Sequence, residues 1–528
     1  MSFPSLLDAT LEQLSNGLAN GQFTSVQLVK AYLARIEQVN GFVHAVTEIN
    51  PDALDIAISR DEDRAKGIVL GPLHGIPVLV KNNIATKDKM NNTAGSSLLL
   101  GAKVPRDAFT VHRLRTAGAI ILGKTNLSQW ANYRSRGTSI EGWSIDGGQT
   151  LAAYHRNQAP GGSSSGSGVA VDLGLAWAAL GTETDGSILD PAHRNGIVGI
   201  KPTVGLTSRD LVIPISEHFD TVGPMARTVR DTAYLLQAIA GEDIHDKYTS
   251  TIPDIPDYPS ACKDALTGAR IGVPWNIINQ ALSEQSWLGI EVDAFRSALS
   301  TLEAAGATII EANFTSTANE LLLAQRPIFR ADFPVNLAAY LAQLTSNPHD
   351  IHSLADVRDK TREHPREDFP NRNTQAWDGV LEQGWDNTDP RFKTAYEHLQ
   401  ELGGPGGLLG ALDKHHLIAV AMPTSLAYKW AAVVGAPAVT VPMGRYPYSA
   451  PVRKDIGSEL VDTGPGVPFG MCFLGKKWSE ADLIGLAYGF EQRTKVRDGE
   501  VRRVVEPNAE IGGLQKYGSF QHSAPSAW

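Results

Sequence analysis

The stretch Pro160-Gly161-Gly162-Ser163-Ser164-Ser165-Gly166-Ser167-Gly168 is followed, after an apolar run, by Gly181-Thr182-Glu183-Thr184-Asp185-Gly186-Ser187. Glycine lets the backbone approach a ligand closely and adopt a positive φ, at an entropic cost that needs a reason. Serine-rich loops with free amide N–H groups suit an anion or a developing oxyanion. A flexible linker has a similar composition, but linkers seldom run straight into an apolar segment such as Val169-Ala170-Val171. We therefore predict a functional site here.

Short apolar runs on either side of this stretch predict strands of a buried sheet. Ile76–Val80 is rich in β-branched residues and is followed by Lys81, and Ala119–Leu122 stops at Gly123. Both runs have the length and composition of buried strands. Further strands are predicted at Arg270–Val273, Ala307–Ile310, Leu417–Met422, Ala438–Met443 and Gly470–Leu474. Because ligands gather beyond the carboxyl ends of such strands, we expect Lys81 to lie near the site.

Predicted helices alternate with these strands. Thr24-Ser25-Val26-Gln27 has the pattern of a capping box, and Glu284–Ala305 reads as a helix ahead of the strand at Ala307. This alternation predicts an α/β fold with a largely buried sheet. Length alone would allow about two to four domains, but α/β enzymes often form one larger unit. We predict a single large domain over residues 1–528, with its catalytic core at residues 60–240.

Residues 320–405 differ in character from the rest of the chain. Asp332-Phe333-Pro334 predicts the start of a helix, and a polar stretch with isolated Trp377 and Trp385 follows. The glycine-rich run Gly403–Gly407 closes the segment. We interpret it as a helical elaboration near the substrate cleft.

Composition and termini exclude several classes of protein. A net charge of −10 argues against a nucleic-acid partner, and no segment approaches the length of apolar chain that a membrane span needs. The N-terminus Met1–Pro4 has neither a basic region nor an apolar one, so we expect a cytoplasmic protein. Cys262 and Cys472 are the two cysteines, and the sequence has no HExxH or CxxC motif. We expect no metal and no cofactor.

Three blocks of the chain together resemble the amidase signature family, serine hydrolases that cleave carboxamides with a Ser-Ser-Lys triad. Leu79–Ile84 resembles the lysine block, Gly161–Gly168 the Gly/Ser loop and Gly181–Ala192 the nucleophile block. The two serines of the motif are 24 positions apart, as in the family. Thr-Glu-Thr-Asp-Gly-Ser resembles the peptide-amidase-like branch. The resemblance, dense over residues 5–240 and thinner over 415–495, implies a mixed sheet of many strands covered on both faces by helices.

The resemblance implies a role for each member of the triad. Ser187 would attack the amide carbonyl, Ser163 would relay protons, and Lys81 would be the base. A lysine base must be neutral, and burial lowers a lysine pKa. Only the motif separates Ser163 from its neighbours, and family members hold this serine with a cis peptide bond. The backbone N–H groups of the oxyanion hole would belong to Thr184, Asp185, Gly186 and Ser187.

Tentative substrate contacts are Gly161, Gly162, Asp185 and Leu189. Asn82 stands where the family usually has aspartate, which should lower the Lys81 pKa further. Asp185 replaces a glycine of the family motif, and it could orient a substrate amine or cap a turn. Leu189 stands where many members have arginine, which argues against a small anionic amide. Together with the aromatic residues of the 320–405 segment, this favours a neutral, fairly large amide.

The sequence also matches two other motif patterns. Gly118–Thr125 matches the phosphate-loop pattern, but Ala-Ile-Ile-Leu predicts a buried strand and not a flexible loop around an anion. Gly162–Gly166 matches the nucleophile elbow of α/β-hydrolases, with Ser164 at its centre. That fold needs a downstream acid and histidine. The candidate histidines are His193, His218, His415 and His416.

Two other activities share the signature chemistry. An acyltransferase would pass the acyl group to an amine, and the A component of an amidotransferase would supply ammonia from glutamine within a complex. Asp185 and Leu189 argue against the second. We expect a small-molecule or peptide amide as substrate, and the sequence leaves the oligomeric state open, a homodimer included.

Overall fold

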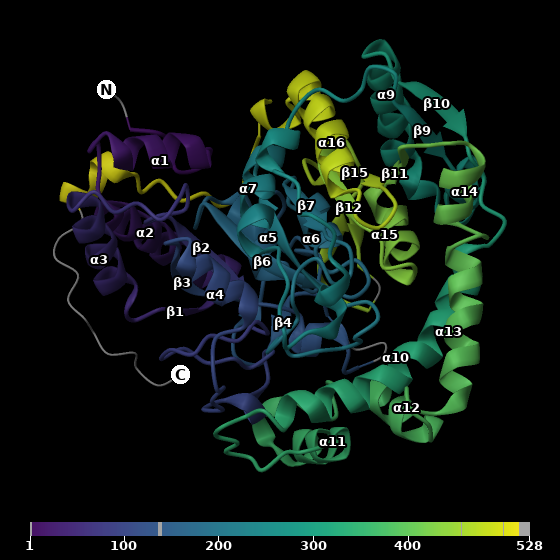
Figure 1. Ribbon diagram of the computed structural model, residues 1–528, viewed down its shortest axis with the longest axis horizontal. Coiled ribbons are helices and arrows are strands. Elements are labelled where there is room, and N and C mark those ends of the chain that lie inside the picture. The colour runs from purple at the N-terminus through teal and green to yellow at the C-terminus, as the bar shows by residue number, and fades with distance from the viewer. Residues whose placement is uncertain (1–2, 136–139, 456, 500, 517–528) are drawn as a thin grey trace.

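One mixed sheet runs through the molecule, as the computed structural model in Figure 1 shows. The structure describes residues 3–135, 140–455, 457–499 and 501–516. Within these residues the sheet has 11 strands in the order β1-β3-β2-β6-β8-β7-β12-β15-β11-β9-β10. Their bounds, in this order, are Val46–Ile49, Ile120–Thr125, Pro77–Lys81, Ala178–Glu183, Thr221–Ala226, Val198–Lys201, Ala438–Arg445, Pro468–Leu474, Ala419–Pro423, Arg270–Val273 and Thr308–Glu311.

Parallel pairing in one half of the sheet brings the two signature blocks together. β2 pairs in parallel with both β3 and β6, and Val80 lies opposite Leu180. The carboxyl ends of β2 and β6 therefore meet at one edge, although about 100 positions separate them in the chain. Lys81 ends one of these strands, and the loop to Ser187 leaves the other.

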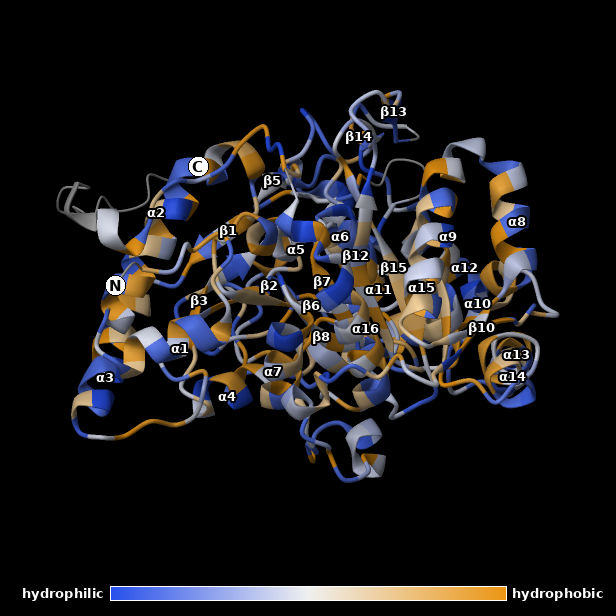
Figure 2. Ribbon diagram, turned by 90° about the horizontal axis from the view of Figure 1, so that it is seen from above, coloured by the Kyte–Doolittle hydropathy of each residue, from blue (hydrophilic) through white to orange (hydrophobic). Residues whose placement is uncertain are grey.

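Helices cover both faces of the sheet, as Figure 2 shows. On one face α7 packs against α4 and α16, and on the other α6 packs against α5 and α15. The predicted single α/β domain with a mixed sheet is confirmed. The helix bounds are α1 Leu11–Ala19, α2 Ser25–Val43, α3 Ala53–Ala65, α4 Phe109–Thr116, α5 Ser165–Asp172, α6 Leu189–Arg194, α7 Val229–Ile239, α8 Trp275–Glu284, α9 Gly289–Ala304, α10 Ala318–Leu341, α11 Leu354–Glu363, α12 Gln375–Gln383, α13 Pro390–Gly403, α14 Leu408–Lys414, α15 Thr424–Val433 and α16 Glu480–Thr494.

Within the described ranges, no helix combines the length and the apolar character that crossing a membrane would require.

The phosphate-loop motif lies in a strand. β3 covers Ile120–Thr125, and all of its residues are buried. Lys124 Nζ donates to the Ile84 carbonyl at 2.5 Å and to Asn92 Oδ1 at 2.7 Å. A lysine engaged in this way is not available to a phosphate group, so the motif is accounted for by the fold.

Residues 320–405 are mostly helical, and Figure 1 shows α10–α13 along one rim of the molecule. The predicted helix start at Asp332 is wrong, because α10 begins at Ala318 and contains both Pro327 and Pro334. Its N-cap is Thr317, which forms a capping box with Glu320.

One of the two tryptophans noted in this segment lies in the interior of the protein. Trp377 is fully buried. It packs edge-on against Trp130, with ring centroids 5.7 Å apart, in a small core of its own. Its ring therefore contributes to packing, and the expectation that it favours a large substrate is not supported.

A buried ion pair anchors this segment to the sheet domain. Glu367 is fully buried, and its Oε2 accepts from Arg134 Nη1 at 3.0 Å and from Gln129 Nε2 at 2.8 Å. Its Oε1 accepts from Ser96 Oγ at 2.8 Å and from the Ser97 N–H at 2.7 Å. One carboxylate thus joins two loops of the sheet domain to the rim.

Replacing Glu367 should destabilise the protein strongly. Glu367→Ala leaves the buried Arg134 guanidinium without its counter-charge, a change that typically costs about 3–5 kcal/mol. Urea unfolding followed by tryptophan fluorescence measures the loss, because Trp130 and Trp377 lie in the affected core. Glu363→Ala, at an exposed position of the same segment, should change the free energy of unfolding by less than about 0.5 kcal/mol. Equal effects of the two substitutions would contradict this assignment.

Candidate active site

Lys81 is fully buried at the end of β2. Its Nζ lies 2.7 Å from Ser163 Oγ, 2.9 Å from Thr182 Oγ1 and 3.1 Å from the Thr182 carbonyl oxygen. Burial lowers the pKa of Lys81 to about 7, although the carboxylates of Asp220 and Glu183 act in the opposite direction. A large fraction of this lysine is therefore neutral near neutral pH.

The three contacts of Nζ match the hydrogen-bonding capacity of a neutral amine. Such an amine has two N–H donors and one lone pair, and the Thr182 carbonyl can only accept. With the second N–H on Thr182 Oγ1, the lone pair is left for the hydroxyl proton of Ser163. This geometry suits Lys81 as the acceptor of a proton from Ser163.

Ser163 follows a cis peptide bond between Gly162 and Ser163. The Ser163 carbonyl accepts from the Ser128 N–H at 3.0 Å, and the Gly162 N–H donates to Asp190 Oδ2 at 2.9 Å. Gly161 has a φ of +72°, and a Cβ there would lie 2.7 Å from the same Asp190 oxygen. Only glycine fits position 161 without displacing that carboxylate.

The neighbouring serines have different partners, which separates them from Ser163. Ser164 Oγ donates to the Thr182 carbonyl at 3.1 Å, and Ser165 Oγ donates to the Gly161 carbonyl at 2.6 Å. Both side chains are fully buried. A buried hydroxyl bonded to a backbone carbonyl is a structural group, so the nucleophile elbow centred on Ser164 is not supported.

No histidine is hydrogen-bonded to these serines among the described residues. His193 Nε2 contacts Asp190 Oδ1 at 3.3 Å, and His218 Nδ1 contacts Asp332 Oδ2 at 2.9 Å. His415 and His416 follow α14, where the His415 carbonyl accepts from Arg270. The histidine-dependent mechanism therefore has no geometric support.

Ser187 lies partly exposed between β6 and α6. Its carbonyl accepts from the Ser164 N–H at 3.1 Å, which ties the nucleophile block to the Gly/Ser loop. In the described part of the chain no hydrogen bond joins the Ser187 and Ser163 hydroxyls. Gly186 has a φ of +91°, and a Cβ there would lie 3.0 Å from the Tyr428 ring. Packing and backbone conformation therefore both require glycine at position 186.

The backbone N–H groups of this loop fall into two sets. Glu183 Oε2 accepts from the N–H groups of Ile188 at 2.7 Å and Leu189 at 2.9 Å, and the Gly186 backbone also stabilises this carboxylate. The N–H groups of Thr184, Asp185 and Ser187 donate to no acceptor within the described residues. These three donors are available for an oxyanion.

The predicted substrate contacts have different environments. Asp185 Oδ2 forms an ion pair with Lys429 Nζ at 3.0 Å, and Asp185 Oδ1 is buried without a partner. Leu189 is fully buried and belongs to the main hydrophobic core, so its side chain does not face a substrate. The prediction for Leu189 is wrong because α6 turns this side chain inward. Gly161 and Gly162 remain predicted contacts.

A cavity of about 430 Å³ lies beside the nucleophile loop. It is lined by α8, the start of α10 and α15, including Leu426, Tyr428 and Lys429. Tyr428 packs against Gly186, and Lys429 binds Asp185. The cavity is thus one layer of side chains away from the loop that holds Ser187.

Sequence reasoning missed one polar partner of the lysine, Thr182, and the asparagine that bonds to that threonine. Thr182 Oγ1 lies 2.9 Å from Lys81 Nζ and accepts from Asn83 Nδ2 at 3.0 Å. Thr182 is part of the serine-to-serine stretch, and its position on β6 opposite β2 could have indicated this contact. Asn82 Nδ2 donates to Thr93 Oγ1 at 2.9 Å, so this side chain anchors the loop that carries Thr93.

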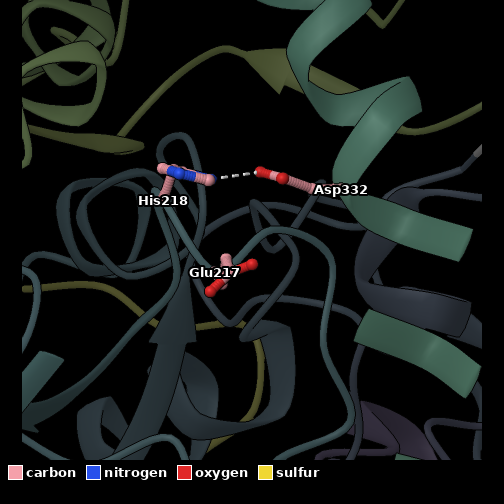
Figure 3. A group of neighbouring side chains, drawn as sticks. All are labelled: Glu217, His218 and Asp332. Carbon is pink, nitrogen blue, oxygen red and sulfur yellow. Dashed lines mark hydrogen bonds and ion pairs between the residues drawn. The ribbon is translucent and has the colours of Figure 1, made fainter. Parts of the chain in front are cut away.

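One group of side chains in the described residues has the geometry of a metal site. Glu217, His218 and Asp332 lie close together, and Figure 3 shows the contact between His218 and Asp332. Protein donors already reach both carboxylates: Lys247 lies 2.7 Å from Glu217 Oε2, and Asn387 bonds to Glu217 at 3.0 Å and to Asp332 at 2.9 Å. This group is therefore interpreted as a hydrogen-bond network.

Comparisons with known proteins agree over most of the chain. A family model described as Amidase matches residues 27–484. A protein named "Putative amidase" from Arthroderma benhamiae is 50% identical over 540 aligned residues, which cover 97% of this chain and 89% of that protein. The solved structure of native peptide amidase from Stenotrophomonas maltophilia gives a TM-score of 0.83 at 38% identity, and the match covers 96% of this chain and 100% of that one. The A component of the glutamyl-tRNA(Gln) amidotransferase from Chloroflexus aurantiacus is 38% identical over 335 residues, 63% of this chain and 65% of that protein.

Lys81 should titrate near pH 7. Lysine-selective NMR across a pH series should show an ammonium signal that loses its proton near this pH and that is absent in Lys81→Met. The buried Lys124 also has a pKa lowered by burial to about 7, so Lys124→Met is the control that separates the two signals. A Lys81 signal that stays protonated up to its ordinary pKa of about 10.4 would contradict the neutral-amine geometry.

Proposed function

The chain belongs to the Amidase family, and on this premise we propose that it hydrolyses a carboxamide through an acyl-enzyme on Ser187. The observation that carries the proposal is the 2.7 Å contact between Lys81 Nζ and Ser163 Oγ, made by a lysine whose burial lowers its pKa to about 7. A serine hydroxyl needs such a base, because it is a weak nucleophile at neutral pH.

The proposed reaction moves one proton along the triad. Ser187 Oγ attacks the carbonyl carbon while its proton passes to Ser163 Oγ, and the Ser163 proton passes to neutral Lys81. The resulting ammonium returns a proton by the same route to the leaving nitrogen, and the C–N bond breaks. Water then attacks the ester carbonyl while the triad removes its proton. The bond between Ser187 Oγ and the acyl carbon breaks as that proton returns to Ser187 Oγ, and the acid is released.

The oxyanion would be held by backbone donors of the nucleophile loop. The N–H groups of Thr184, Asp185 and Ser187 support this assignment, because no protein acceptor competes for them in the described residues. Gly186 was predicted as a fourth donor, but its interaction with Glu183 favours a role in shaping the loop. Each donor of this kind is commonly worth about 10²–10³-fold in rate.

The proposed substrate is the amide of a peptide or of a similarly neutral acyl group. The peptide amidase from Stenotrophomonas maltophilia shares 38% identity over its full length, which supports this class. The Asp185–Lys429 ion pair leaves the loop without an unpaired charge, so neither a strongly anionic nor a strongly cationic substrate is favoured.

Hydrolysis is favoured over the two alternatives. In sequence, the protein named "Putative amidase" from Arthroderma benhamiae matches 97% of this chain at 50% identity, whereas the amidotransferase component matches 63% at 38% identity. An acyltransferase would use the same acyl-enzyme and differ only in the second nucleophile. Adding hydroxylamine distinguishes acyl transfer, which would give a hydroxamate in preference to the acid.

A serine-directed fluorophosphonate should modify Ser187 alone. Intact-mass analysis with peptide mapping should find one adduct, absent in Ser187→Ala and slowed at least about 10³-fold in Lys81→Ala. Ser165→Ala is the matched control, since that hydroxyl binds the Gly161 carbonyl, and it should keep most of the reactivity. An adduct on Ser164 would overturn the assignment of the nucleophile.

Peptides with a C-terminal amide should release ammonia faster than small anionic amides of equal concentration. The rate should rise with pH through about 7, because the base acts in its neutral form above its pKa. Ammonia release from each substrate, corrected with Ser187→Ala, provides the measurement. A preference for small anionic amides, or a rate that is independent of pH down to about pH 5, would speak against this proposal.

A further inference from the structure

Asp220 connects the candidate oxyanion loop to a segment far along the chain. It is largely buried, and its Oδ1 accepts from Thr184 Oγ1 at 2.5 Å. Its Oδ2 accepts from the N–H groups of Ile215 at 2.8 Å and Ser216 at 3.0 Å. Both oxygens are thus occupied, one by the nucleophile loop and the other by the loop of residues 215–220, here called the Asp220 loop.

Helix α10 fixes the Asp220 loop from the other side. Ser216 Oγ donates to Asp332 Oδ2, and His218 Nδ1 lies 2.9 Å from the same oxygen. The Glu217 N–H donates to Asn336 Oδ1 at 2.8 Å. Figure 3 shows His218 of this loop facing Asp332 of the helix, with Glu217 nearby. Two side chains of α10 therefore hold three consecutive residues of the loop.

We propose that Asp220 is a positioning residue that sets the Thr184 N–H for the oxyanion and that the α10 contacts hold it in place. The proposal rests on the proposed function, because it gives Thr184 its role in the oxyanion hole. Asp220 itself touches neither substrate nor reacting atoms. Its influence passes through one hydroxyl to the backbone that carries the donor.

Asp220 also acts on the base through its charge. The charged groups that face Lys81 are Asp220 and Glu183, and both favour its ammonium form. Asp220 is itself faced by Arg209, whose Nη1 binds the Asp220 carbonyl at 3.2 Å. Burial raises the pKa of Asp220 to about 6. Above that pH its negative charge stabilises the protonated lysine, and removing the charge must lower the Lys81 pKa.

The test measures the rate of Ser187 modification by a fluorophosphonate between about pH 5.5 and 9.5. Asp220→Asn should react about 10- to 100-fold more slowly at high pH, where the lysine is neutral, because the loop is misplaced. The pH at which its modification rate rises should be lower than in the wild type. A purely structural role would lower the rate without shifting this pH.

A second pair of variants keeps the proposal testable should Asp220→Asn not fold. Thr184→Val removes the hydroxyl with little change in shape, and it should slow the reaction at high pH by about 10-fold or more. Thr184→Ser keeps the hydroxyl and should restore the rate. A Thr184→Val protein that reacts as fast as the wild type would overturn the proposal.

Asp231→Asn is the matched control. Asp231 is buried and accepts from the Leu11 N–H at 2.8 Å, at a distance from the nucleophile loop. This variant should keep both the wild-type rate of Ser187 modification and its pH dependence. If Ser187 of the wild-type protein does not react, the acyl-enzyme proposal is overturned. If the wild type reacts and Asp220→Asn has the same rate and the same pH dependence, only this inference is overturned.

Discussion

The removal of one amine from water is the constraint on which the rest of the site depends. A lysine at a strand end would ordinarily keep its ammonium in solvent. Here β3 and β6 flank β2, and Lys81 is fully buried between them. The cost of burying its charge favours the neutral amine, whose lone pair lies within reach of the Ser163 hydroxyl. The polar and charged neighbours of the amine, among them Thr182 and Asp220, shift the equilibrium between its ammonium and neutral forms.

The sequence was sufficient to predict the architecture, whereas the candidate site was chosen from a motif and stays a prediction. Apolar runs such as Ile76–Val80 predicted buried strands, because composition and length suffice for that. The choice of Lys81 came from a motif, since burial alone does not single it out. Lys124 and Lys201 are also fully buried, with their pKa values lowered by burial to about 7 and about 8. Only the contact with Ser163 distinguishes the three, and that contact is not visible in a sequence.

The errors arose where tertiary packing decided the outcome. Leu189 follows the motif by two positions, yet a short helix turns it into the core. Pro334 suggested a helix start, but α10 begins at the Thr317 cap and continues through this proline. The connection from Asp332 through Ser216 to Asp220 spans 116 positions of sequence, and no local sequence pattern predicts it. Polar contacts between distant elements are therefore the part that sequence reasoning misses.

The hydrogen bond from the Ser164 N–H to the Ser187 carbonyl has an evolutionary consequence. It joins the two loops through backbone atoms, so their spacing does not depend on the side chain at either position. Under the proposed mechanism, a point mutation at Ser187 would thus end the chemistry while the backbone arrangement that held it persists. Descendants of such a chain can lose activity in one step and remain well folded, so abundance and thermal stability are poor guides to which copies of the fold are still enzymes.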